Sequence, residues 1–150
     1  LGGLAGASPE DLATALPAIA IGLLPLWLLR WKVNLLSLGD EEARAMGVDA
    51  TRVRFTVIAA ATLMTAAAVS VAGIVGWIGL VVPHFARLAV GPDFARLAPV
   101  SAAVGAVFLL AVDTVARTTA SIEIPLGVLT AFVGTPLFLW QLIASRRSWQ

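Results

Sequence analysis

Uncharged apolar runs separated by short polar segments make up most of the chain. Residues 12–29 carry no charge over 18 positions, residues 55–86 carry none over 32, and residues 124–145 carry none over 22. A membrane-spanning helix needs about 20 mainly apolar residues to cross the hydrocarbon core of a bilayer. The pattern therefore predicts an all-α fold, a polytopic transmembrane helix bundle.

The run 55–86 is too long for a single crossing, since 32 helical residues would extend about 48 Å through a core of roughly 30 Å. Gly73, Gly76 and Gly79 recur every three residues within it, and Pro83 follows. We therefore expect one full span, a break and a shorter returning helix. Irregular backbone at membrane depth needs protein or a water-filled cavity around it, so the three glycines are candidates for lining a transport pathway.

These boundaries define one transmembrane domain over residues 1–150 with about five spans. The predicted spans are residues 12–30, 54–72, 76–90, 97–117 and 124–145. Trp27 and Trp31, which flank Arg30 and precede Lys32, are typical of an anchor at the membrane interface.

Residues 34–54 are the one long polar interruption. Asp40, Glu41 and Glu42 follow Gly39, and carboxylates at the start of a helix interact favourably with its dipole. Gly47 lies where a left-handed residue would end that helix. We expect a short helix outside the bilayer at residues 39–47, which the pattern alone allows to be either an ordinary solvated loop helix or a docking site for a soluble partner.

The basic residues predict the orientation of the spans. With five alternating crossings, nine of the ten Lys and Arg residues fall on one side, and Arg117 alone falls on the other. Because basic residues are enriched in cytoplasmic loops, the short polar helix and the C-terminus are predicted to be cytoplasmic. The N-terminal end of this chain is then outside.

Composition supports the membrane interpretation, with 59% hydrophobic and 13% charged residues, whereas a soluble domain carries about a quarter charged residues. The ten basic and nine acidic residues nearly cancel, so no net basic surface suggests a nucleic-acid partner. The lack of cysteine excludes disulfides and thiolate chemistry. The chain begins at Leu1 without a signal-peptide pattern, which indicates a fragment.

Few residues suggest catalytic chemistry. His84 is the single histidine, so no histidine pair for a metal can form, and neither a P-loop nor a GxSxG motif occurs. His84 is either structural or the base of an intramembrane enzyme. Asp113 lies one helical turn before Arg117, either as an ion pair that fixes helix depth or as the coupling carboxylate of an ion-coupled secondary transporter. Glu123, before Ile124 and Pro125, is a candidate helix-start residue.

Several motifs in order resemble one family. The run GWIGLVVPHFARLAVGPDFARLAPVSAAVGAVFLLAVDTVAR, followed by EIPLGVLTAFVGTPLFLW, is similar to the C-terminal half of the FecCD-type permeases. These are membrane subunits of ABC importers for ferric siderophores, haem and cobalamin. Upstream, NLLSLGDEEARAMGV resembles the cytoplasmic coupling segment of that family. The resemblance extends over residues 12–140 and implies that the five spans are the last five of ten.

The resemblance also implies an assembly in the bacterial cytoplasmic (inner) membrane. Its members would be a second permease subunit, expected to be identical, two ATP-binding cassette subunits that carry ATP and Mg²⁺, and an extracytoplasmic substrate-binding protein. The chain itself would be no enzyme and would bind no cofactor or metal. The residues implied to contact the ATPase are Leu36, Leu38, Gly39, Asp40, Glu41, Glu42, Ala43, Arg44, Met46 and Gly47. Arg117, in DTVAR, matches a position that faces the binding protein.

The function implied by the resemblance is alternating-access import of an iron chelate, driven by ATP. A ferric siderophore is the expected cargo because it is the commonest one in the family, and haem and cobalamin remain alternatives. An ion-coupled secondary transporter and an intramembrane enzyme are the alternatives from other classes.

Overall fold

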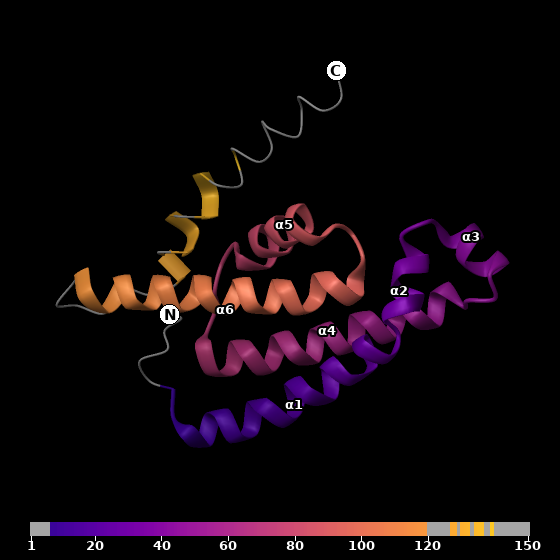
Figure 1. The fold of residues 1–150 in the computed structure, drawn as a ribbon. Coiled ribbons are helices and arrows are strands. Elements are labelled where there is room, and N and C mark those ends of the chain that lie inside the picture. The colour runs from indigo at the N-terminus through magenta and orange to yellow at the C-terminus, as the bar shows by residue number, and fades with distance from the viewer. Residues whose placement is uncertain (1–6, 120–126, 129, 133, 137–138, 140–150) are drawn as a thin grey trace. The chain divides into compact units, whose positions relative to one another are not determined.

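The computed structural model describes residues 7–119, 127–128, 130–132, 134–136 and 139, and these residues are helical with short connections and no β-strand (Figure 1). Six helices are named in chain order: α1 (Pro9–Leu28), α2 (Arg30–Leu36), α3 (Asp40–Ala45), α4 (Ala50–Ala72), α5 (Ile78–Val90) and α6 (Phe94–Thr119). The described residues between 127 and 139 are also helical, and the rest of the predicted span 124–145 lies outside the described residues. The predicted all-α membrane helix bundle is confirmed.

Three of the helices in the described part of the chain are long and apolar enough to cross a membrane, namely α1, α4 and α6. The returning helix α5 has 13 residues, which corresponds to about 20 Å of helix. The helix alone is therefore shorter than the hydrocarbon core, as expected for the shorter returning helix.

Capping side chains place the starts of two spans earlier than the apolar runs suggest. Ser8 and Asp11 form a reciprocal capping box, so α1 begins at Pro9 rather than at residue 12. The Asp49 carboxylate accepts a hydrogen bond from the backbone N–H of Arg52, and α4 begins at Ala50 rather than at residue 54. Charged residues therefore occupy the first turns of both helices.

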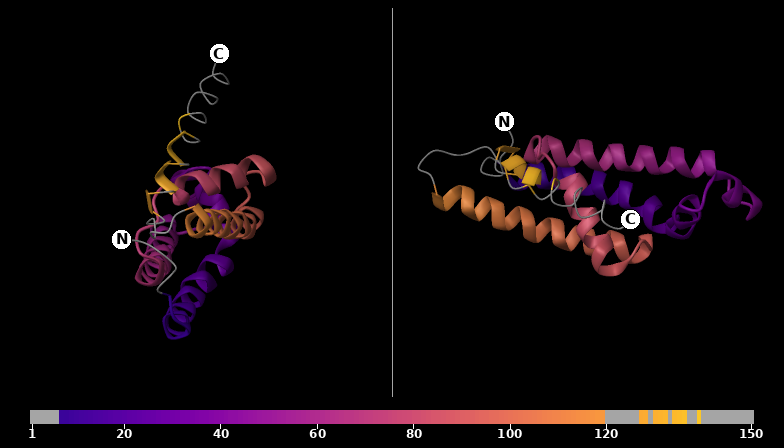
Figure 2. Two further views of the ribbon diagram at one scale, coloured as in Figure 1. Left: turned by 90° about the vertical axis from the view of Figure 1, so that its left-hand side faces the viewer. Right: turned by 90° about the horizontal axis from the view of Figure 1, so that it is seen from above.

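The chain divides into two compact units, and the first consists of Ala7–Val71 with Pro92–Arg96. It contains α1 to α4 and the turn that leads into α6. Within it, α1 and α4 lie side by side (Figures 1 and 2). They approach closely at Gly22, where an added Cβ would lie 2.9 Å from the carbonyl oxygen of Ala60. The glycine is therefore required by the close approach of the α4 backbone.

The second unit contains Ala72–Gly91 and the described residues from Leu97 onward. Here α5 packs on α6 at Gly105, where an added Cβ would lie 3.6 Å from Val82 Cγ1, an ordinary van der Waals distance. Further along α6, Val112 and Ala116 are buried together with Phe108 packed against them.

Candidate functional site

The helix α3 is held in a corner that we name the α2–α4 corner, consisting of residues 33–57. Its apolar centre comprises the buried residues Leu35, Ala43, Val48 and Val53, with Val33, Leu36 and Val57 packed against them. Ala43, in the middle of α3, has an exposed fraction of 0%. The corner thus gives α3 a small core of its own, and the burial of Ala43 fixes which face of α3 is turned outward.

The C-terminus of α3 is closed by a Schellman motif. Gly47 has φ +77°, its N–H bonds the carbonyl of Arg44, and the N–H of Val48 bonds the carbonyl of Ala43. The apolar contact between Val48 and Ala43 that accompanies such a motif is part of the buried cluster. The turn that ends the helix therefore also packs it into the corner.

The N-terminus of α3 is bound to α4 by an ion pair. Arg54 Nη2 lies 2.6 Å from Asp40 Oδ1, and Nη1 lies 3.3 Å from Oδ2, so the guanidinium binds the carboxylate with both nitrogens. The hydrogen bond from Arg54 lowers the pKa of Asp40 below its ordinary value. This pairing shows that Asp40 is already engaged within the chain.

The outward face of α3 combines apolar and charged side chains. Leu38 and Met46, at the two ends of the helix, have exposed fractions of 61% and 46%. Glu41, Glu42 and Arg44 are exposed beside them. A mixed apolar and acidic surface of this kind suits a protein partner that offers an apolar groove with basic residues.

The structure therefore separates the expected ATPase contacts into two groups. Leu38, Met46 and the exposed charged residues of α3 are accessible to a partner, whereas Ala43 is buried inside the corner. Leu36 is half-buried and packs on the same apolar cluster. Gly39, with φ +127°, provides the backbone turn into α3, as Gly47 provides the turn out of it.

A polar contact that the sequence pattern did not reveal joins α2 to the turn before α6. Asn34 Nδ2 donates a hydrogen bond of 2.6 Å to Asp93 Oδ1, and Asn34 Oδ1 accepts one of 2.8 Å from the N–H of Phe94. The bond from Asn34 is the largest cause of a lowered pKa of Asp93. The available signals were a lone amide among apolar residues and an aspartate in a Gly-Pro-Asp turn.

The segment between α4 and α5 contains two of the three glycines proposed for a pathway. Gly73 has φ +69° and Gly76 lies in the non-helical stretch, whereas Gly79 is inside α5 with open space where a Cβ would lie. Trp77, which precedes α5, adopts the left-handed conformation with φ +66°. The break is thus a region of special backbone geometry, a feature that clusters at functional sites.

Two glycines of the last predicted span lie against this break. A Cβ added to Gly127 would lie 2.9 Å from the carbonyl oxygen of Ile74, and one added to Gly134 would lie 2.6 Å from Trp77 Cβ. Neither position has room for a side chain unless the backbone moves. Small residues here therefore permit the close approach of the last span to the break.

The remaining candidate residues lie in the second unit. Arg117 is in α6, and its side chain is outside the described residues. Asp113 is half-buried on the same helix, and His84 is exposed on α5. Glu123 is outside the described residues. Among the described residues, no three His, Cys, Asp or Glu side chains are grouped to hold a metal ion.

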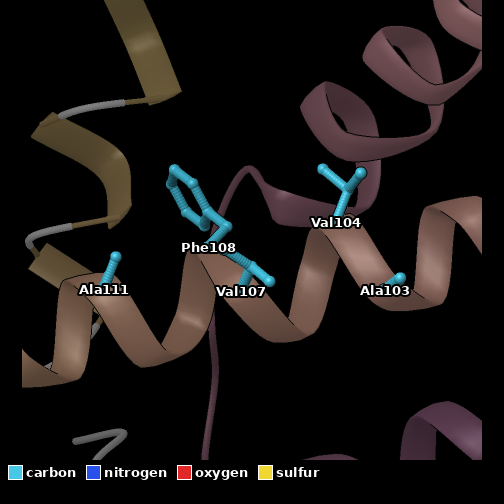
Figure 3. Close-up of a pocket in the computed structure, with 5 residues that line it drawn as sticks. All are labelled: Ala103, Val104, Val107, Phe108 and Ala111. Carbon is cyan, nitrogen blue, oxygen red and sulfur yellow. The ribbon is translucent and has the colours of Figure 1, made fainter.

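A shallow apolar recess of about 500 Å³ lies along α6 (Figure 3). It is lined by Ala103, Val104, Val107, Phe108 and Ala111. Binding sites for polar ligands present a few placed hydrogen-bonding groups, and this lining has none. The recess suits lipid chains or an apolar helix.

Comparison with known proteins gives consistent matches. The profile of the FecCD transport family matches residues 1–144. A cobalamin import system permease protein of Halobacterium salinarum is 46% identical over 95% of this chain and 38% of its own length. A hemin transport system permease protein of Yersinia pestis is 42% identical over 87% of this chain and 38% of its own length.

A solved structure resembles the fold. An ABC transporter assigned to the metal-chelate type, in an inward-facing conformation, superimposes with a TM-score of 0.87 at 39% identity. The match covers 91% of this chain and 44% of that chain. The present chain thus spans about two fifths of the length of the relatives that it matches, 38% for the cobalamin permease and 44% for the solved structure.

Proposed function

Because the chain belongs to the FecCD transport family, we propose that it forms the C-terminal half of a permease in an ATP-driven importer. In this proposal it is a multi-pass subunit of the bacterial cytoplasmic membrane, with the α2–α4 corner and the C-terminus in the cytoplasm. The distribution of basic residues, nine on one side and one on the other, supports that orientation.

The main support for the proposal is the set of contacts that fix α3 in the α2–α4 corner. A short acidic helix projects between two membrane-spanning segments and is fixed to α2 and α4 by a buried cluster, a Schellman motif and the Asp40–Arg54 ion pair. An isolated six-residue helix would not be stable in water, so this much local support indicates a helix whose position matters. Leu38, Met46, Glu41, Glu42 and Arg44 then form its contact surface for an ATP-binding cassette subunit.

The proposed assembly contains two such cassette subunits, a second identical permease and an extracytoplasmic binding protein. ATP and Mg²⁺ belong to the cassette subunits, and this chain is a transport component with no catalytic role. ATP binding displaces the α2–α4 corner, and the displacement opens or closes a path between the two permeases. Such a step can do work only if the contacts differ in free energy between the two states.

The proposed cargo is an iron chelate, with a ferric siderophore first and haem next, and the cobalt chelate cobalamin is a further alternative. The two curated relatives described above are named for cobalamin and for hemin, which supports a large metal chelate as the chemical class. The break around Gly73 and Gly76 is the proposed pathway element, because irregular backbone at membrane depth needs protein or a water-filled cavity around it. Arg117 is the proposed contact for the binding protein.

The test is purification of the protein from its own membrane through a C-terminal tag, followed by native mass spectrometry and uptake in proteoliposomes. We expect a bound pair of ATPase subunits and uptake of a ferric siderophore that requires ATP and persists when the proton gradient is collapsed. Uptake that follows the proton gradient instead would replace this proposal with an ion-coupled transporter. Haem and cobalamin, offered in parallel, identify the cargo.

A further inference from the structure

Asn34 and the turn before α6 are joined by a reciprocal pair of hydrogen bonds. The Asn34 amide donates to the Asp93 carboxylate at 2.6 Å and accepts from the Phe94 N–H at 2.8 Å. Both side chains are half-buried, and 59 residues separate them in sequence. Hydrogen bonds to a charged group are among the stronger ones, and partial burial reduces competition from water.

The same contact organises the start of a long helix. Asp93 accepts the Ala95 N–H through its carboxylate at 3.2 Å and the Arg96 N–H through its carbonyl at 3.1 Å. These are backbone groups that the first turn of α6 would otherwise leave unpaired. Asn34 therefore holds the N-terminus of a helix of 26 residues, and it does so from the helix that leads into the corner.

Because of the chain connectivity, this contact links the movement of α2 to that of α5 and α6. Pro92–Arg96 groups with α1 to α4 in one compact unit, whereas the helices on both sides of it, α5 and the rest of α6, belong to the other unit. The turn is thus covalently continuous with α5 and α6 and hydrogen-bonded to α2. A displacement of α2 that keeps these bonds intact must move the turn with it.

We propose that the Asn34–Asp93 pair is a positioning contact that passes displacement of the α2–α4 corner to α5 and α6 during transport. The inference rests on the proposed function and names a residue pair through which the coupling acts. The pair itself stays formed in both states, because a contact that breaks when α2 moves cannot pass that movement to the turn before α6. The free-energy difference that drives the change lies in the contacts at the two ends of the link.

Three variants separate this role from general stability. Asn34→Asp places a carboxylate against the Asp93 carboxylate, and at pH 8 both are ionised and repel. Asp93→Asn keeps a hydrogen bond, since the Asn34 amide can still donate to the new carbonyl oxygen. The double variant, Asn34→Asp with Asp93→Asn, restores the pair with donor and acceptor exchanged, and the new carboxylate still accepts the Phe94 N–H.

The measurement is uptake per ATP hydrolysed by the complete importer in proteoliposomes, with thermal unfolding and ATPase co-purification measured in parallel. For Asn34→Asp we expect ATP hydrolysis to continue while uptake per ATP falls about tenfold, a loss within the usual range of coupling effects. Asp93→Asn and the double variant should transport nearly as the parent does. Failure of the unsubstituted importer to transport with ATP would overturn the proposed function together with this inference. A transporting importer in which Asn34→Asp leaves uptake per ATP unchanged would overturn the inference alone.

A second measurement decides the question if Asn34→Asp does not fold. The sequence has no cysteine, so Ser37→Cys and Arg96→Cys can carry a pair of spin labels at two exposed positions beside the contact. We expect the distance between the labels to be the same without nucleotide and with ATP trapped on the cassette subunits. A change in that distance beyond the spread of the labels would show that the pair separates during the cycle, which would overturn the proposal.

Discussion

Arg54, one turn into α4, binds the carboxylate of Asp40 at the first residue of α3 through both of its terminal nitrogens, at 2.6 and 3.3 Å. The guanidinium fork fits a carboxylate in this way, and an ammonium group does not. The N-terminus of the projecting helix is therefore fixed to the membrane-spanning helix that follows it. Its C-terminus is fixed separately, by the Schellman motif at Gly47.

Replacing Arg54 by Gln should release the N-terminus of α3. We expect the pKa of Asp40 to rise towards its ordinary value, because the hydrogen bond from Arg54 is the largest cause of its lowering. Amide hydrogen exchange in α3 should become faster. NMR titration of the Asp40 carboxyl and exchange mass spectrometry check the two effects. The matched control is Arg52→Gln, which removes an exposed pair with Asp49 at the start of α4 itself and should leave α3 protected.

The pH dependence of this effect has a defined sign. Because the pKa of Asp40 is lowered in the folded state, the pair's contribution is complete above the ordinary carboxyl pKa. It is lost as pH falls through the lowered pKa. The melting temperatures of the parent and of Arg54→Gln should therefore differ at neutral pH and converge in acid. A difference that persists below the carboxyl range would show that the substitution acts through packing.

Substitutions at Gly47 test the turn that ends α3, because a side chain there would not clash with neighbouring atoms. Its φ is +77°, and no atom lies within 4 Å of an added Cβ, so a substitution acts through backbone strain alone. Gly47→Val should destabilise the protein by about 1–2 kcal/mol, since branched residues resist the left-handed region. Gly47→Asn should be much milder because asparagine tolerates that region. Thermal unfolding in detergent ranks the variants, and equal melting temperatures for Val and Asn would contradict the assigned turn.

Gly22 tests the contact between α1 and α4. An added Cβ would meet the Met64 side chain, which can move, and the Ala60 carbonyl oxygen at 2.9 Å, which cannot. Gly22→Ala should therefore cost about 1–3 kcal/mol of stability through overpacking. Gly105→Ala is the control, because its Cβ would lie 3.6 Å from Val82, and alanine favours a helix. Equal effects of the two substitutions on the melting temperature would count against the α1–α4 contact.

The general arrangement could be predicted from the sequence because its signals are local. Uncharged runs indicate membrane helices, the glycine spacing indicates a break, and the acidic start and Gly47 indicate a short helix. The structure places these elements at α4, α5 and α3 with boundaries shifted by a few residues, and α4 begins early, at Ala50, because Asp49 caps it. Capping of this kind depends on which side chain turns back to the backbone.

The geometry of the site could not be predicted in the same way. The resemblance implies that Ala43 contacts the ATPase, yet it is buried, because the direction that a helix face takes depends on the angles between α2, α3 and α4. The Asn34–Asp93 contact spans 59 residues, and no local pattern encodes such a distance. The resemblance alone therefore does not tell which of the implied contact residues face outward, and the structure is needed to separate them from the buried ones.

Gly134, in the last predicted span, should not tolerate a side chain, because it lies against Trp77 in the break between α4 and α5. Gly134→Ala would place a Cβ 2.6 Å from Trp77 Cβ, so we expect a loss of about 1–3 kcal/mol from overpacking. In a Trp77→Gly background, which lacks the clashing Cβ, Gly134→Ala should cost less stability than it does in the parent. Gly79→Ala, with open space around it, is the control for stability. An equal cost of Gly134→Ala in the parent and in the Trp77→Gly background would mean that the clash is not the cause.

Arg117 should steer the extracytoplasmic binding protein to the permease, because it is the single basic residue predicted on the outer side. Charges at the rim of an interface act mainly on the association rate, so Arg117→Glu should slow docking on the order of tenfold at low salt. Raising the salt concentration should narrow the difference in association rate between Arg117→Glu and the parent. Lys32→Glu makes the same charge change on the predicted cytoplasmic side and should leave docking unaffected. Association kinetics on nanodisc-embedded importer measure both variants, and equal rates for the parent and Arg117→Glu would remove Arg117 from the docking surface.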